Sequence, residues 1–213
     1  MREHLHYKHY MFAPDDMQTY FKENPIIKGA AQKVLLYPDF LNGYIGGDFI
    51  HVCNTEILRK HPFDERIRIY EGLFFLMFYR DAQQMLFTNK VVTVRERHRE
   101  DSVSKECLRT NDAIIRRITL SEELFKQYFF EDLYKLGMKR RMVATNLTLL
   151  DNYVLMGCYD KALALLPELK GVHMKKKAVL KWTAILHGGI IYQLLLRVYL
   201  FFKYRILKRK FQI

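Results

Sequence analysis

Hydrophobic and polar positions follow two different patterns along this chain of 213 residues. Beyond about residue 110, apolar residues recur every three or four positions, which is the spacing of amphipathic helices. Three such helices are predicted, at 121–136, 141–156 and 159–169, and a glycine follows each of them. Before about residue 105 the apolar runs are short and separated by turn residues. The pattern therefore predicts a mixed α/β region followed by an all-helical region.

The first region is expected to contain several short elements. Residues 1–16 predict irregular structure or the end of a strand, and 34–37 is a short apolar run. A short helix is expected after Asp15-Asp16 and reaches Phe21, and a glycine-rich segment at 41–47 leads into a strand at 48–53. Two helices follow, one at 56–60 capped by Asn54 and a buried one at about 70–83. The region ends with two strands, 85–88 and 91–97, joined by a turn at Asn89-Lys90.

Charge sets the C-terminal tail apart. The net charge is +12, yet residues 169–213 contain eleven Lys and Arg and no carboxylate, so residues 1–168 carry only +1. Within this basic tail, the apolar stretch 182–202 is long enough to cross a bilayer as a helix, but a central Arg such as Arg197 costs roughly 2.5–3.5 kcal/mol there. We therefore predict a helix that lies in the interface of an anionic membrane. A helix packed on its own domain is the alternative.

The side chains of such a tail helix would separate by chemistry. One side would hold Gln193, Arg197, Tyr204 and Lys208, and apolar residues such as Ile190, Leu194 and Val198 would cover the rest. Nucleic acid is not expected as a partner, because the cations flank an apolar run and residues 1–168 are nearly neutral. Three widely spaced cysteines and a polar N-terminus favour a cytoplasmic protein with reduced thiols.

Candidate chemistry begins with Glu71, at the start of the helix expected to be buried. A half-desolvated carboxylate binds a proton more tightly, which suits Glu71 to act as a general base. The alternative is a first-turn residue stabilised by the helix dipole. Asp15 and Asp16 offer the hard oxygen ligands that divalent cations prefer, or else they cap the following helix.

Arginines alternate with other residues near position 97. If residues 91–97 continue as a strand, Arg95, Arg97 and Arg99 share one face and can receive phosphate groups. A solvated strand edge is the alternative. His98 lies between them and is a candidate for a metal ligand or a phosphate contact, although an exposed His in a charge cluster is more often neither.

Several motifs together resemble the acceptor-side half of family 2 glycosyltransferases. They are Gly46-Gly47-Asp48-Phe49, then Asn54-Thr55-Glu56-Ile57-Leu58, then residues 62–71 with the sequence PFDERIRIYE, and then residues 94–104, which are similar to a "YR-x-H" line followed by serines. Phe12-Ala13-Pro14-Asp15-Asp16 resembles the end of the family's metal-binding "DxD" motif, with Ala13 where its first acid would stand. Glu71-Gly72 aligns with the family's "ED" pair, whose aspartate is the base.

This resemblance implies a fold class and a division into domains. The fold is expected to be α/β, with a partial mixed sheet of the GT-A type followed by a C-terminal helical region. Residues 1–105 would form the partial glycosyltransferase domain, 106–172 a helical extension and 173–213 a basic membrane-associating tail. The nucleoside-binding half of the family is missing, so an open sheet edge and an uncovered sheet face are expected.

The resemblance also implies an activity. The chain would take part in transferring a sugar from a nucleotide-sugar donor to a glycan or lipid-linked acceptor at the inner face of the cell membrane, and it would be inactive alone without a nucleoside-binding half. Glu71 would be the catalytic base; Arg97, His98 and Arg99 would bind the donor diphosphate; Asp48 and Asp64 would bind the acceptor; and Asp15 and Asp16 would hold Mn²⁺ or Mg²⁺. A non-enzymatic, membrane-associated helical adaptor is the alternative function.

Overall fold

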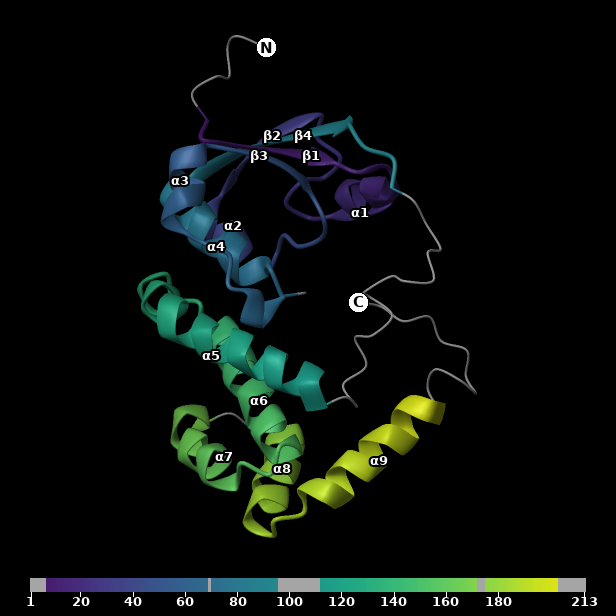
Figure 1. Cartoon of the computed structure of the whole chain (residues 1–213), viewed down its shortest axis with the longest axis vertical. Coiled ribbons are helices and arrows are strands. Elements are labelled where there is room, and N and C mark those ends of the chain that lie inside the picture. Colours follow the sequence, from purple (N-terminus) through teal and green to yellow (C-terminus); the bar gives the residue numbers. More distant parts are fainter. Residues whose placement is uncertain (1–6, 69, 96–111, 172–174, 203–213) are drawn as a thin grey trace. The chain divides into compact units, whose positions relative to one another are not determined.

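The computed structural model describes residues 7–68, 70–95, 112–171 and 175–202 (Figure 1). The chain divides into two compact units. Unit 1 comprises residues 1–103 and 131–141, and unit 2 comprises residues 104–130 and 142–213. The predicted class is confirmed at this level, because an α/β region with a four-stranded mixed sheet precedes a helical C-terminal region.

Unit 1 is built around the sheet, whose strands are short. The strands are β1 (His9–Ala13), β2 (Gln32–Leu36), β3 (Ile50–Cys53) and β4 (Gln84–Val91). The α-helices between them are α1 (Gln18–Glu23), α2 (Tyr37–Leu41), α3 (Thr55–Lys60) and α4 (Gly72–Ala82), with 3₁₀ turns η2 (Asp15–Met17) and η3 (Glu65–Ile67). The strand order is β2-β4-β1-β3, in which β1 runs parallel to β4 and the other two pairs are antiparallel.

Local capping confirms some of the predicted boundaries. The side chain of Asn54 accepts hydrogen bonds from the backbone N–H groups of Glu56 and Ile57 at the start of α3. The short helix after Asp15-Asp16 is also present, as η2 and α1, and it ends before Asn24. The sequence pattern missed α2, whose first turn is fixed by a hydrogen bond from the Leu36 N–H to the Asp39 carboxylate.

The predicted hairpin at Asn89-Lys90 is wrong, because β4 continues through these residues to Val91. The strand has a neighbour on each side, and the Asn89 N–H donates to the carbonyl of Ala31 at 2.8 Å. Pairing on both sides outweighs the turn preference of an Asn-Lys pair. The second predicted strand is also wrong over its described part, since residues 92–95 have no regular structure.

Helices α2, α3 and α4 lie on one face of the sheet (Figure 1). Aromatic side chains dominate the core of unit 1, and the fully or almost fully buried ones are Phe21, Tyr37, Phe40, Phe49, Phe78, Tyr79 and Phe87. Helix α4 is less buried than its apolar sequence predicts, because only Leu73, Phe78 and Tyr79 are buried. On the sheet, register aligns Val34, Leu86, Tyr10 and Val52 in one row across all four strands. The end residues of this row, Val34 and Val52, are exposed.

Unit 2 contains the helical region. Its elements are the first part of α5 (Asp112–Lys135), α6 (Lys139–Leu155), α7 (Tyr159–Leu165), η5 (Leu166–Leu169), α8 (Lys175–Ile185) and α9 (Gly189–Phe201). The predicted glycine stops are confirmed after α5, α6 and η5, since Gly137, Gly157 and Gly171 all have positive φ. Leucines dominate the core, among them Leu147, Leu149, Leu150, Leu165, Leu169 and Leu180.

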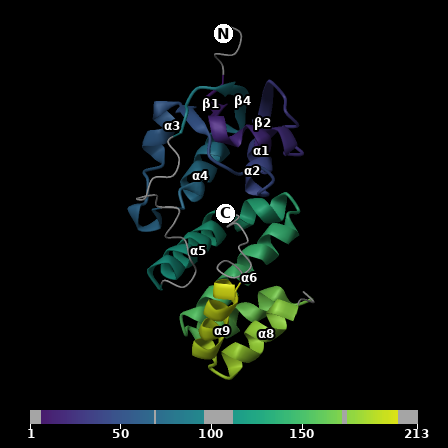
Figure 2. The same cartoon turned by 90° about the vertical axis from the view of Figure 1, so that its right-hand side faces the viewer.

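The continuous helix predicted for 182–202 is wrong. The chain bends between α8 and α9 (Figures 1 and 2), and His187 has a φ of +52°. Leu180 and Ala184 of α8 lie in the core of unit 2, whereas much of α9 is exposed. Tyr204 and Lys208 lie outside the described residues. None of the helices within the described ranges has the length and apolar character that crossing a bilayer requires.

Candidate functional site

The polar residues that follow β1 and β4 lie side by side in unit 1. The N–H of Asp15 donates to the carbonyl of Thr93 at 3.1 Å, and the N–H of Arg95 donates to the Asp15 carboxylate at 3.0 Å. Because β1 and β4 are parallel, their C-terminal ends point the same way, and these two bonds keep the chain segments together beyond the sheet. The strands therefore position Asp15 and Arg95.

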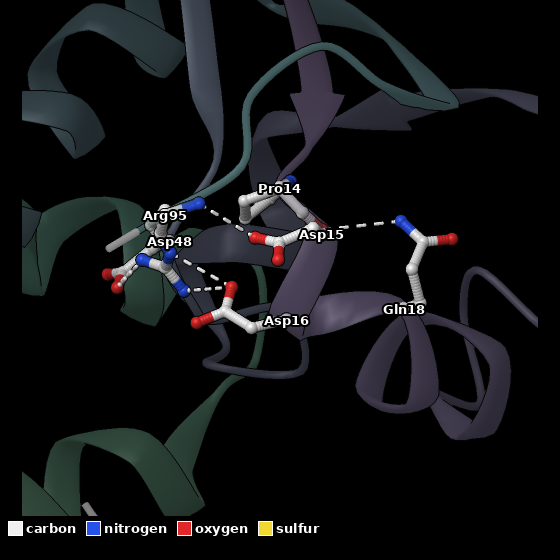
Figure 3. Close-up of polar contacts among 6 residues, drawn as sticks. All are labelled: Pro14, Asp15, Asp16, Gln18, Asp48 and Arg95. Atoms are coloured by element: carbon white, nitrogen blue, oxygen red, sulfur yellow. Dashed lines mark hydrogen bonds and ion pairs between the residues drawn. The ribbon is translucent and has the colours of Figure 1, made fainter. Parts of the chain in front are cut away.

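The guanidinium of Arg95 joins two further carboxylates (Figure 3). Its Nε and Nη2 donate to Asp16 Oδ1 at 2.9 and 2.5 Å, and its Nη1 donates to Asp48 Oδ2 at 2.5 Å. We call Asp15, Asp16, Asp48 and Arg95 the Arg95 cluster. The carboxylates of Asp16 and Asp48 thus bind the cation, and that of Asp15 binds the backbone of the same residue, at the end of the sheet where ligands of α/β proteins commonly bind.

The cluster is open to solvent on one side. Arg95 and Asp16 have side chains less than one third exposed, whereas the side chain of Asp48 is 76% exposed. Partial burial lowers the pKa of Arg95, but its hydrogen bonds and ion pairs with Asp16 and Asp48 outweigh this effect, so the pKa is raised above its already high ordinary value. Arg95 therefore remains a cation at every physiological pH.

A glycine-rich loop, residues 42–47, positions Asp48 in the cluster. The Tyr20 hydroxyl accepts from the N–H of Gly46 at 3.1 Å, and the Asn24 amide donates to the carbonyl of Tyr44 at 3.0 Å. Gly47 has a φ of +99°, which a residue with a Cβ rarely adopts. Asn24 is itself buried and accepts from two N–H groups after α1, so it ties this loop to that helix.

Two other predicted carboxylates occupy separate turns of unit 1. Asp64 caps η3 and pairs with Arg66 through Nη2 at 2.6 Å, and its hydrogen bonds with Arg66 lower its pKa. Glu71 immediately precedes α4, is half-buried, and its carbonyl accepts from the Phe75 N–H at 3.1 Å. Arg97, His98 and Arg99 lie outside the described residues, so their predicted contacts to a diphosphate stay predictions.

The predicted cation site at Asp15 and Asp16 offers two carboxylates, which suit a metal ion that is also bound by the phosphates of a substrate. Across the described ranges, no group of three or more His, Cys, Asp or Glu side chains is arranged to hold a metal ion. Mg²⁺, however, commonly takes one or two carboxylates together with substrate phosphates and water. The two aspartates, which accept hydrogen bonds from Arg95, are therefore compatible with a metal ion that arrives on a nucleotide diphosphate.

The sequence did not predict a buried pair of histidines, His9 of β1 and His51 of β3. His9 Nε2 and His51 Nδ1 lie 2.9 Å apart, and His9 is fully buried against Phe78 and Tyr79. Burial lowers the pKa of His9 to about 3, with a further contribution from His51, and burial lowers the pKa of His51 to about 4 against the opposing effect of Asp48. Both rings are therefore neutral at pH 7 and serve as packing groups.

The signal for this pair was weak. His9 lies in a polar, His-rich N-terminal segment, and only the strand pairing of His9 with Cys53 brings it near His51. The central role of Arg95 was also missed, because Arg95, Arg97 and Arg99 alternate along the sequence and nothing in the pattern distinguishes one from the others. Comparison with protein families, with curated proteins and with solved structures finds no match for this chain.

Proposed function

We propose that the chain is the acceptor-side part of a glycosyltransferase that uses a nucleotide-sugar donor. The observation that carries this proposal is the Arg95 cluster. The resemblance to family 2 glycosyltransferases assigns Asp15 and Asp16 to a divalent metal ion and Asp48 to acceptor binding. All three carboxylates accept hydrogen bonds from Arg95: Asp16 and Asp48 from its guanidinium, and Asp15 from its backbone N–H. Residues separated by more than 30 positions in the sequence have no local reason to meet there.

The chemistry of the proposed reaction is a displacement at the anomeric carbon. An acceptor hydroxyl oxygen forms a bond to that carbon, the bond from the carbon to the diphosphate oxygen breaks, and its electron pair leaves with the nucleoside diphosphate. The hydroxyl proton passes to a carboxylate, for which Glu71 remains our candidate. A cation stabilises the negative charge that develops on the departing diphosphate.

Arg95 is suited to that last task because it is always charged and presents a planar set of donors that match phosphate oxygens. Asp16 and Asp48 hold the guanidinium at the end of β1. Asp15 and Asp16 would hold a divalent metal ion when the nucleotide sugar brings one, and the metal would add charge neutralisation at the diphosphate.

Calorimetric titration of the full chain with UDP-glucose and GDP-mannose, in the presence of Mn²⁺, tests this proposal. We expect binding that weakens in Asp16→Asn and in Arg95→Gln, because both changes remove a diphosphate or metal contact. Glu65→Gln is the matched control, since it removes an exposed carboxylate outside the cluster. Failure of the chain to bind either nucleotide sugar, or equal weakening in the control, would contradict the proposal.

A further inference from the structure

Helix α9 exposes large apolar side chains over about half of its circumference. Their exposed fractions range from 52% to 74%, and the residues are Ile190, Ile191, Leu194, Leu195, Val198, Tyr199 and, at the C-cap of the helix, Phe202. At about 100° per residue, these positions fall within one half of a helical wheel. We call them the apolar face of α9. Such a contiguous apolar surface is unusual for a part of a protein that contacts only water.

Specific contacts hold the opposite side of α9 to unit 2. The Tyr192 hydroxyl donates to the buried carboxylate of Asp151 at 3.0 Å, and Lys176 of α8 binds the other oxygen of the same carboxylate at 2.6 Å. Asp151 thereby links α8, α9 and α6. Rotation of α9 that would bury its apolar face would have to break this buried, charge-assisted contact.

The start of α9 is fixed as well. The Tyr159 hydroxyl donates to the carbonyl of His187 at 3.0 Å and accepts from the N–H of Gly189 at 3.0 Å, while its ring stacks on His187 with centroids 4.5 Å apart. A Cβ added to Gly189 would lie 2.5 Å from the Val154 carbonyl oxygen. The bend and the direction of the apolar face are therefore built into the packing of unit 2.

The charged residues of α8 and α9 themselves have one sign, while Asp112 of α5 accepts a hydrogen bond from the Gln193 amide at 3.4 Å. Residues 169–213 contain no Asp or Glu, and exposed cations lie on α8 at Lys175 and Lys181 and on α9 at Arg197. Trp182 is exposed next to Lys181, whose Nζ lies 5.9 Å from the centroid of the indole ring. Exposed Trp and Lys side chains, together with an exposed aliphatic helix face, are typical of segments that lie at a membrane interface.

We propose that the apolar face of α9, with Trp182 and the neighbouring cations, docks on a bilayer surface that contains anionic phospholipid. The apolar side chains enter the acyl boundary, and Lys175, Lys181 and Arg197 contact lipid phosphates. The helix lies parallel to the membrane, because its other side is packed on unit 2. A soluble partner with a complementary groove would match the apolar side chains, but it would not account for the absence of every carboxylate from residues 169–213.

The test uses the full chain with vesicles of phosphatidylcholine, alone or mixed with phosphatidylglycerol. Because Trp182 is the single tryptophan and the proposal places it at the bilayer, its fluorescence reports on docking. We expect co-sedimentation with the anionic vesicles, a blue shift of the emission, and weaker binding at high salt. Leu194→Glu should weaken binding by about tenfold or more, because it places a carboxylate in the centre of the apolar face.

Leu136→Glu is the matched control, since Leu136 is also an exposed leucine and lies outside α9. It should bind vesicles as the wild type does. Equal binding by Leu194→Glu and the wild type would overturn the proposal. It would also be overturned by a protein that ignores vesicles and sediments as a dimer, with Leu194→Glu restoring the monomer. Asp16→Asn should leave vesicle binding unchanged, so this result is independent of the sugar-transfer proposal.

Discussion

The two units bury different kinds of side chain. Unit 1 packs aromatic rings in a connected group, with ring centroids of Phe21 and Phe49 4.9 Å apart and those of Phe40 and Tyr79 4.2 Å apart. Unit 2 is packed mostly with leucines from α6, α7, η5 and α8. Rings interlock in few orientations, whereas leucines adapt more readily, so the two cores should respond differently to the same loss of volume.

The units also differ in one buried titratable group each, although both contain buried polar atoms without a hydrogen-bond partner among the described residues. Unit 1 contains the fully buried His9, one of whose ring nitrogens, Nδ1, has no hydrogen-bond partner among the described residues. In unit 2 the buried carboxylate of Asp151 contacts Tyr192 and Lys176. A neutral buried histidine favours folding only while it remains unprotonated, so we expect the acid sensitivity of the protein to originate in unit 1.

Truncation in the aromatic core should have the largest effect. Phe87→Ala removes a fully buried ring that contacts Phe21 and Phe49, and should lower the free energy of unfolding by about 3–5 kcal/mol. Leu150→Ala should cost about 2–5 kcal/mol in the more adaptable core of unit 2. Urea denaturation followed by circular dichroism measures both values, with exposed Tyr134→Ala as the control. A cost for Phe87→Ala no larger than the control's would refute the aromatic-core description.

Acid should destabilise the protein through the histidine pair. The pKa values of His9 and His51 are lowered by burial to about 3 and about 4, below the ordinary 6.5 that they regain on unfolding. The unfolded state therefore binds protons first, so stability is complete above pH 6.5 and falls as the pH drops toward 4. For His9 alone, the loss at pH 4 is roughly 3 kcal/mol. Urea midpoints at a series of pH values measure this loss.

A double variant separates this effect from general acid sensitivity. His9→Phe with His51→Phe keeps aromatic groups beside Phe75, Phe78 and Tyr79, and should flatten the pH dependence between pH 7 and 4. His187→Asn removes an exposed histidine at positive φ, which Asn tolerates, and should leave the slope unchanged. Asp48, Cys53 and Tyr79 are the other titratable groups near the pair among the described residues. An unaltered slope in the double variant would assign the acid sensitivity to other groups.

The sequence predicted much of unit 2 because its signals are local. Periodicity and terminal glycines located the ends of three helical segments, but α5 already includes Asp112 rather than beginning at 121, and 159–169 divides into α7 and η5. The exposure of Ile190, Leu194 and Val198 agrees with the predicted apolar side of the tail helix. The bend between α8 and α9 was missed because its cause is distant, namely the contacts of Tyr159 with His187 and Gly189. In unit 1, similarly, the turn expected at Asn89 was overridden by two neighbouring strands.

Within the candidate site, the sequence identified the carboxylates as candidates because of their chemistry. That they meet at Arg95 could not be predicted, because it depends on the parallel pairing of β1 with β4.

The bend between α8 and α9 offers a matched pair of substitutions. In Gly189→Ala the new Cβ would lie 2.5 Å from the backbone oxygen of Val154, which cannot move without disturbing α6, so the protein should lose about 1–3 kcal/mol. In Gly188→Ala the nearest atom is 3.6 Å away, and the cost should stay below about 1 kcal/mol. Thermal melting compares the two variants. Equal costs would mean that Gly189 is not sterically required.

The smallest expected effect distinguishes the Arg95 cluster from an ordinary surface ion pair. Arg95→Gln should lower the free energy of unfolding by about 1 kcal/mol, because the partly buried guanidinium forms ion pairs with both Asp16 and Asp48. Arg66→Gln removes a bidentate but solvent-exposed pair with Asp64, and should change stability by less than about 0.5 kcal/mol. A double-mutant cycle of Arg95→Gln with Asp16→Asn isolates the coupling, which should shrink at high salt. A coupling no larger than that of Arg66 with Asp64 would show that Arg95 and Asp16 form an ordinary surface ion pair.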